Sequence, residues 1–225
     1  MTNMVSSLDG GATVDGVSKG LGGPGDRAVF VALRAQADAV LVGAGTARTE
    51  QYRMPRTPPE TLARQRSDRG QHPAPALVVI SASLDFDDAL PFLGESASGA
   101  EPPIILTVRS APADRRRALS GRCAVIDAGD DAVEPRAALD ALWALGHRVV
   151  LCEGGPRLLG TMIADGVVDE WNQTIAPLLV GGEAPRIITG PAPAGRPFTL
   201  VRLLRDESHL FASYRRADTR VTNDS

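Results

Sequence analysis

Short runs of hydrophobic residues recur along the chain, and stretches with helical spacing separate them. Several runs are apolar throughout, including Val40-Leu-Val42 and Leu77-Val-Val-Ile80, which is typical of strands that are covered on both faces. This alternation predicts an α/β fold with a largely parallel central sheet flanked by helices. We expect strands at residues 3–8, 39–43, 76–81, 103–108, 123–128, 148–152 and 172–180.

The stretches between these runs place apolar residues on one helical face. Val29, Phe30 and Leu33 share such a face in the first of them. Another helix is expected to open at Pro156, because proline is favoured in the first helical turn. We expect helices at residues 26–37, 134–145 and 156–166, and short helices near residues 57 and 112.

The C-terminal part of the chain has a different pattern. Residues 198–205 and 210–215 have strand composition and a short polar connection, which predicts an antiparallel hairpin at the edge of the sheet. Residues 217–225 are polar and predict a frayed C-terminal tail. The only candidate linker, residues 94–103, lies inside the strand series. We therefore expect a single domain over residues 1–216.

Composition and charge exclude several classes of protein. The chain has 225 residues, of which 43% are hydrophobic and 23% charged, as in ordinary globular proteins. Its 24 basic and 27 acidic residues give a net charge of −3, without the basic excess of a nucleic-acid binder. Neither a membrane-spanning run nor a signal-peptide core is present, so we expect a cytoplasmic protein that binds neither membrane nor nucleic acid.

Cysteine and histidine do not form a metal-site pattern. Cys123 and Cys152 lie in apolar runs, where a small buried side chain is the ordinary interpretation. His72, His147 and His209 lie far apart, with no carboxylate or cysteine at metal-ligand spacing. We expect no metal and no disulfide framework.

Three glycine-bearing strand ends carry polar side chains just past an apolar run. They are Glu153-Gly-Gly-Pro156, Gly43-Ala-Gly-Thr46 and Asp9-Gly-Gly11. Ligands of open α/β sheets bind outside the carboxyl ends of parallel strands, so these ends are expected to converge on one crevice. Free amides at a helix that opens at Pro156 suit a phosphate, although a tight connection alone also explains the two glycines.

The polar side chains at these ends also allow two interpretations. Glu153 ends a buried strand, where a carboxylate is costly unless it binds a partner or a ligand. Asp9 either binds a ligand or closes the turn before Gly10. Thr46 offers a hydroxyl beside flexible backbone, or simply belongs to a turn.

Six arginines cluster between residues 48 and 69, interleaved with acidic residues. Most of them are expected to form a solvated surface, while one or two are candidates for a bidentate contact with a substrate phosphate. They are Arg48, Arg53, Arg56, Arg64, Arg66 and Arg69.

Taken together, these stretches resemble the reductase domain of bacterial riboflavin biosynthesis, a dihydrofolate-reductase-like family. The family reduces a ribosylaminopyrimidine 5′-phosphate, of the 5-amino-6-ribosylaminouracil type, with NADPH. The matching blocks come in family order: residues 6–10 with 16–18, 33–46, 153–156, and 166–170 leading to 175–182.

The resemblance implies roles for individual residues. The NADPH contacts are implied for Val5, Thr46, Glu50, Ser81, Gly154, Gly155, Pro156, Arg157 and Leu158, with Ser81 near the adenosine ribose and its 2′-phosphate. The substrate contacts are implied for Ser18, Arg34 and Glu153, with Arg53 or Arg56 at the substrate phosphate. Arg34 has a second interpretation as the partner of a neighbouring acid. Asp9 and Glu153 are the candidate catalytic carboxylates, and solvent is the alternative proton source.

One segment departs from the family pattern. Relatives carry paired aspartates and a proline after the G-x-G-T stretch, whereas this chain has Glu50 and Gln51 and lacks the Asp-Pro pair. The residues implied to bind the cofactor match the family pattern better than those implied to bind the substrate. A dihydropterin or dihydrofolate reductase and a catalytically silent NADP-binding module therefore remain alternatives. The resemblance also implies a homodimer, for which residues 175–180 are a candidate interface or else internal core.

Overall fold

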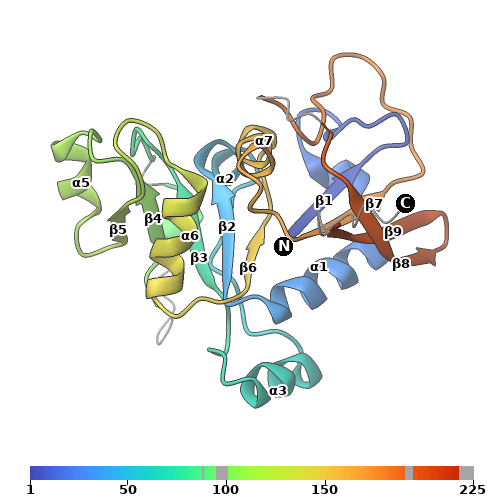
Figure 1. Ribbon diagram of the computed structural model, residues 1–225, viewed down its shortest axis with the longest axis horizontal. Coiled ribbons are helices and arrows are strands. Elements are labelled where there is room, and N and C mark those ends of the chain that lie inside the picture. The colour runs from blue at the N-terminus through green and yellow to red at the C-terminus, as the bar shows by residue number, and fades with distance from the viewer. Residues whose placement is uncertain (88, 95–100, 191–194, 218–225) are drawn as a thin grey trace, which may run out of the picture.

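The computed structural model describes residues 1–87, 89–94, 101–190 and 195–217 (Figure 1). Within these residues one sheet contains nine strands in the order β5-β4-β3-β2-β6-β1-β7-β9-β8. The strands are β1 (Thr2–Ser6), β2 (Ala39–Gly43), β3 (Ala76–Ile80), β4 (Ile104–Thr107), β5 (Ala124–Asp127), β6 (Val150–Cys152), β7 (Glu170–Ile175), β8 (Phe198–Asp206) and β9 (His209–Arg216).

The sheet has a parallel part and an antiparallel edge. All pairings from β5 across to β7 are parallel, whereas β9 pairs antiparallel with both β7 and β8. The predicted parallel sheet with a C-terminal antiparallel hairpin is confirmed. The run at 172–180 was predicted too long, because β7 ends at Ile175 and Pro177 has no N–H to continue a ladder.

The predicted helices are present, and three further helical elements, at residues 18–21, 44–49 and 91–94, were not predicted. The helical elements are a 3₁₀ turn η1 (Ser18–Leu21), α1 (Pro24–Gln36), α2 (Ala44–Thr49), α3 (Glu60–Asp68), α4 (Pro91–Gly94), α5 (Ala113–Leu119), α6 (Pro135–Ala144) and α7 (Pro156–Ala164). The helix α2 was not predicted, because glycine and threonine suggest a turn. Burial of Ala44 and Ala47 against the sheet stabilises it instead.

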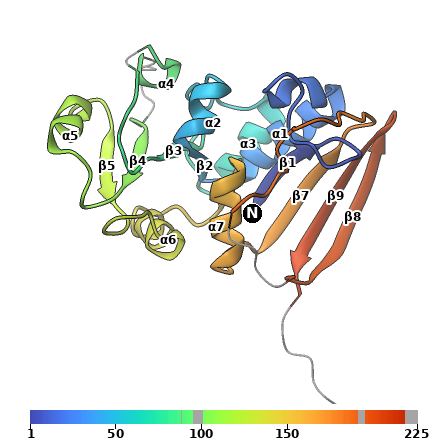
Figure 2. The ribbon, with the colours of Figure 1, turned by 90° about the horizontal axis from the view of Figure 1, so that it is seen from above.

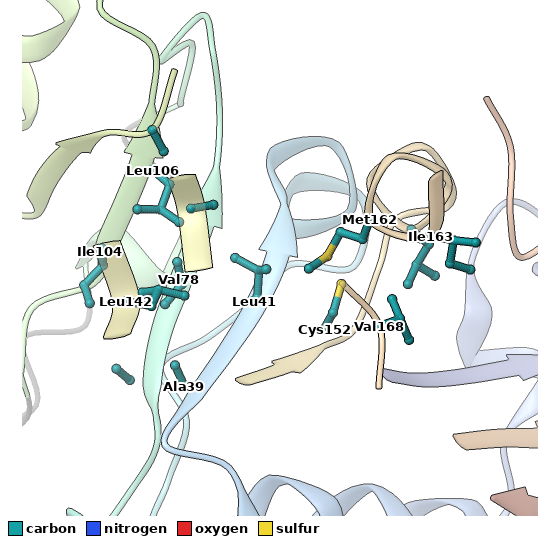
Figure 3. Packing of buried hydrophobic residues seen from close by; sticks show 14 of the residues in the cluster. Ala39, Leu41, Val78, Ile104, Leu106, Leu142, Cys152, Met162, Ile163 and Val168 are labelled. Carbon is teal, nitrogen blue, oxygen red and sulfur yellow. The ribbon is translucent and has the colours of Figure 1, made fainter. Parts of the chain in front are cut away.

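Helices cover both faces of the parallel strands (Figure 2). On one face, Leu41 and Cys152 contact Met162 and Ile163 of α7, in the cluster that Figure 3 shows. On the other face, α1, α2 and α4 lie over the strands, and Leu151 packs against Leu33 of α1. This double coverage explains why the strands are apolar at consecutive positions.

Some expectations fall on parts of the chain that the structure does not describe. Residues 218–225 of the predicted tail and residues 95–100 of the candidate linker lie outside the described residues. The described sheet runs from Thr2 to Arg216, and the single-domain boundary stays a prediction. In the part that is described, every helix is too short or too polar to cross a bilayer.

Candidate active site

Two glycine-rich loops from distant parts of the chain meet at the carboxyl ends of the neighbouring strands β2 and β6. The amide of Gly43 donates a hydrogen bond to the carbonyl of Gly154 at 2.8 Å, and the amide of Glu153 donates to Leu41 at 2.9 Å. The strand β1 lies on the other side of β6. The three strand ends that the sequence indicated therefore lie next to one another at the carboxyl ends of β2, β6 and β1.

The loop after β6 has a backbone that only glycine fits. Gly154 has a φ of +91°, and the peptide bond between Gly154 and Gly155 is cis. A Cβ added at Gly155 would collide with the Thr46 hydroxyl of α2. Because α7 begins directly afterwards and Gly155 provides no side-chain cap, the first amides of α7 stay available to a ligand.

This arrangement fits the phosphates of a dinucleotide. Amides at a helix N-terminus, together with the positive end of the helix dipole, attract phosphate oxygens. Thr46 lies half-buried next to these amides, and Pro156, Arg157 and Leu158 form the first turn of α7. The cofactor contacts implied for these residues stay predictions, but the structure does bring the residues together.

Glu153 forms the centre of a buried polar cluster. It is 8% exposed, and its two carboxylate oxygens accept hydrogen bonds from Arg34 Nε and Nη2 at 2.8 and 2.7 Å. The hydroxyl of Tyr52 donates to Glu153 Oε2 at 2.7 Å. The Phe30 ring lies 4.1 Å from the Arg34 guanidinium and covers one side of it. Glu153 therefore has the partners that a buried carboxylate requires.

The pKa values of Tyr52 and Arg34 define the charges of this cluster. Burial, followed by the Glu153 carboxylate, raises the pKa of Tyr52 well above its usual value, so the phenol stays protonated. Burial acts to lower the pKa of Arg34, but the charge of Glu153 and its hydrogen bonds offset burial, and the pKa is raised. An uncharged phenol and a guanidinium therefore share one carboxylate.

A cavity of about 390 Å³ opens next to this cluster. Three predicted site residues line it: Val5, Ser18 and Glu153. Sequence analysis missed Asn3, Asp26, Phe30 and Tyr52, which line it too; the remaining lining residues are Met4, Ala12, Lys19, Gly22, Gly23 and Arg27. A tyrosine in the polar stretch after α2, in a chain with only two tyrosines, was the available signal for Tyr52.

Glu50, at the end of α2, holds one residue of the cavity wall in place. Its Oε1 accepts a hydrogen bond from the amide of Ser18 at 2.8 Å, which ties the η1 segment to the end of α2. The cofactor contact implied for Glu50 stays a prediction. In the structure, its visible effect is to hold Ser18 at the cavity wall.

Ser81 lies at the carboxyl end of β3. It is 5% exposed, and its hydroxyl accepts a hydrogen bond from the amide of Leu84 at 3.1 Å, which closes a turn. The strand β3 neighbours β2, so Ser81 shares the edge with the loop that carries Thr46. Its implied position near the cofactor ribose stays a prediction.

The arginine-rich segment has mainly a structural role. Arg53 and Arg56 are exposed and lie outside the lining of the cavity, so their contact with a substrate phosphate stays a prediction. Arg66, one of the six arginines of which most were expected on a solvated surface, is 1% exposed. It donates to the carbonyls of Ala37 at 2.6 Å, Ala35 at 3.1 Å and Arg34 at 3.3 Å. It therefore caps the C-terminus of the helix that carries Arg34.

Asp9 closes a turn. Its Oδ1 accepts from the Ser7 hydroxyl at 2.5 Å, and its Oδ2 accepts from the amide of Gly181 at 2.7 Å. These hydrogen bonds, that of Ser7 first, hold the pKa of Asp9 at about 2. Asp9 is exposed and lies outside the lining of the cavity. Its contacts therefore match the interpretation in which it closes a turn, not the one in which it binds a ligand.

Asp9→Asn is expected to make the fold less sensitive to acid. A carboxyl with a pKa of about 2 in the fold, against 3.8 for an unperturbed aspartate, stabilises the fold fully above about pH 4 and loses this effect as pH falls toward 2. The difference in urea midpoint between wild type and variant should therefore shrink on acidification. A difference that stays constant down to that range would contradict this role.

Among the described residues, no three potential metal ligands come together.

Comparison with known proteins identifies similar chains. The chain is 30% identical over 187 residues to the 2,5-diamino-6-ribosylamino-4(3H)-pyrimidinone 5′-phosphate reductase of Methanothermobacter thermautotrophicus, covering 83% of this chain and 81% of that protein. A crystal structure of a pyrimidine reductase-like protein from Corynebacterium diphtheriae superposes with a TM-score of 0.87 at 27% identity, covering 96% of this chain and 91% of the other.

The fold also resembles that of dihydrofolate reductase. Dihydrofolate reductase from Enterococcus faecalis, complexed with NADP(H), superposes with a TM-score of 0.51 at 14% identity, over 96% of this chain and 95% of that one. The predicted dihydrofolate-reductase-like fold is therefore confirmed. The family model described as the RibD C-terminal domain matches residues 1–210, and the chain belongs to this family.

Proposed function

We propose that the protein is an NADPH-dependent reductase that acts on a ribosylaminopyrimidine 5′-phosphate. One observation carries the proposal. The buried Glu153, with Arg34 and Tyr52, forms a wall of the cavity and directly precedes the Gly154-Gly155 loop at the start of α7. A substrate in the cavity would therefore lie next to a cofactor whose phosphates contact α7.

The cofactor side requires little covalent chemistry from the protein. The first turn of α7 and Thr46 would hold the phosphates, and Val5 of β1 would line the space between cofactor and substrate. Bound NADPH supplies a hydride, and the protein contributes by holding donor and acceptor in contact. The acceptor carbon is C1′ of the opened, imine-like ribosylamine.

The substrate side has to orient a polar heterocycle and supply a proton. When C1′ accepts the hydride, the imine nitrogen takes up a proton and becomes a secondary amine. Glu153 lines the cavity and accepts a hydrogen bond from Tyr52, which orients it, so Glu153 is the carboxyl that would exchange the proton. Ser18 and Arg34 would orient the substrate from the η1 segment and from α1.

The decisive experiment follows the absorbance of reduced nicotinamide with the purified protein. The ribosylaminopyrimidine phosphate and dihydrofolate are offered in parallel, each with NADPH and with NADH. We expect oxidation of NADPH with the pyrimidine alone. Oxidation with dihydrofolate alone would replace the proposed substrate, and oxidation with neither would identify a binding module without turnover.

The homodimer stays a prediction, as does a cytoplasmic location. Residues 175–180 divide between core and surface, since Ala176 is buried and Leu179 is 76% exposed. The edge strand β8 provides a larger apolar surface, which supports the dimer: Leu200, Val201, Leu203 and Leu204 are each about half exposed. Sedimentation of the purified protein measures its oligomeric state directly.

A further inference from the structure

Tyr52 occupies a position where the family pattern has proline. It directly follows Gln51, at the point where relatives carry the Asp-Pro pair that this chain lacks. Proline has neither a hydroxyl nor an N–H, whereas Tyr52 uses both. Its hydroxyl donates to Glu153, and its amide donates to the carbonyl of Ala47 at 2.9 Å. The contact with Glu153 is therefore a feature of this chain that the family pattern does not predict.

The hydrogen bonds on Glu153 divide unequally between its two oxygens. Oε2 accepts from the Tyr52 hydroxyl and from Arg34 Nη2, each at 2.7 Å. Among the described residues, Oε1 accepts only from Arg34 Nε, at 2.8 Å. A carboxylate oxygen has two lone-pair positions, so both are occupied on Oε2 and one stays available on Oε1. A proton can therefore join Oε1 without displacing a donor.

The other side chains of this cluster keep their protonation states. Arg34 lies within cation–π distance of the rings of Phe30 and Tyr52, at 4.1 and 5.7 Å, and keeps its charge. The Tyr52 phenol stays protonated because burial, followed by the charge of Glu153, raises its pKa. Burial raises the pKa of the neighbouring Cys152 thiol to about 11. Of these four ionisable side chains, Glu153 alone is left to exchange a proton.

We infer, on the basis of the proposed function, that Tyr52 is a positioning residue that directs proton exchange to Oε1 of Glu153. The proton passes from Oε1 to the imine nitrogen of the substrate, which becomes a secondary amine as C1′ accepts the hydride. Glu153 is left ionised, with both hydrogen bonds on Oε2 intact, and it regains a proton from solvent water.

Tyr52→Phe removes the hydroxyl and keeps the ring, so it opens Oε2 as a second position for the proton. We expect kcat to fall ~10-fold or more with little change in KM, because the substrate still binds but its proton donor is no longer held in one geometry. Tyr214, the only other tyrosine, belongs to β9 and lies outside the lining of the cavity. Tyr214→Phe is therefore the matched control and should keep the wild-type kcat. A wild-type kcat in Tyr52→Phe overturns the inference.

A second substitution strengthens this hydrogen bond and preserves the shape of the side chain. In the Tyr214→Phe background, 3-fluorotyrosine supplied during expression labels position 52 alone, and its phenol is a stronger acid than that of tyrosine. The stronger donor should stabilise the ionised carboxylate and move the pH midpoint of kcat down, whereas Tyr52→Phe should move it up. Lys19, Asp26 and Arg27 line the same cavity and are unchanged in both variants. Midpoints that coincide with wild type contradict the inference.

The infrared spectrum of the free protein identifies the oxygen that carries the proton. A proton on Oε1 leaves Oε2 as the carbonyl oxygen, which accepts from Tyr52, so the C=O stretch of protonated Glu153 should rise in frequency in Tyr52→Phe. Loss of the band in Glu153→Gln assigns it. A band that does not move places the proton on Oε2 and overturns the inference. This measurement requires no turnover, so it still decides the inference where no substrate is reduced, a result that refutes only the proposed function.

Discussion

Replacing Glu153 with glutamine is expected to lower kcat/KM at least ~100-fold, in the range that loss of a proton-transferring group causes. Glutamine has nearly the same shape but carries no charge. It leaves the Arg34 guanidinium, whose side chain is 22% exposed, without its ion-pair partner. It also replaces one of the two acceptor oxygens with an NH2 group, which cannot accept the hydrogen bonds that Arg34 and Tyr52 donate. Arg34→Ala should reduce turnover comparably, because it leaves the buried carboxylate unpaired.

The affinity for NADPH shows whether Glu153→Gln and Arg34→Ala leave the cofactor site intact. Because the Glu153 carboxylate is hydrogen-bonded to Arg34 and Tyr52 and not, among the described residues, to α7 or Thr46, NADPH affinity, followed by nicotinamide fluorescence, should stay close to wild type. Glu60→Gln is a suitable control, because Glu60 is an exposed residue of α3 that forms its ion pair with Arg64. Wild-type turnover in both Glu153→Gln and Arg34→Ala would refute the substrate side of the site.

Arg66→Met is expected to cause the largest loss of stability, about 3 kcal/mol of unfolding free energy or more. The side chain is 1% exposed and donates to several backbone carbonyls at the end of α1, as well as to His72 at 2.9 Å. Removing the guanidinium takes this donor from the carbonyls of Ala37 and His72, whereas the Ala35 carbonyl keeps a hydrogen bond from Arg69 at 2.8 Å. Each carbonyl left buried without a donor costs ~1–3 kcal/mol. Urea unfolding followed by circular dichroism measures the loss.

The matched control lies on the same helix. Arg64 is exposed and pairs only with Glu60, so Arg64→Met should change stability by less than ~1 kcal/mol. Equal effects of the two substitutions would show that Arg66 does not stabilise the fold by capping α1. Because Arg34 belongs to the capped turn, Arg66→Met should also weaken turnover more than NADPH binding.

Much of the fold follows from local pattern. Consecutive apolar positions, as in Leu77-Val-Val-Ile80, predict a strand that is buried on both faces, and helices do cover both faces there. The helix at Pro156 is predictable because proline and the preceding glycines mark its start. The helix α2 is not, because its stability comes from the burial of Ala44 and Ala47 and not from propensity.

A site residue could be predicted where its residue type is unusual for its position in the sequence pattern. Glu153 attracts attention because a carboxylate at the end of a buried strand requires partners. Tyr52 has only the weak signal of a rare residue type, and Asp26 and Arg66 have none. An aspartate in a first helical turn or an arginine among arginines is ordinarily a surface residue. The packing of α1 against β7 determines what Asp26 contacts, and the packing of α3 against the end of α1 determines what Arg66 contacts.

The position of β6 between β1 and β2 has a consequence for biosynthesis. A nascent chain that has emerged only as far as α6 already holds β1 and β2, but not the strand that separates them. The ion pair of Arg34 spans 119 residues of chain, so it too waits for this insertion. The cavity next to Glu153 therefore cannot form before β6 has been synthesised, and until then the early strands expose apolar surface that favours aggregation.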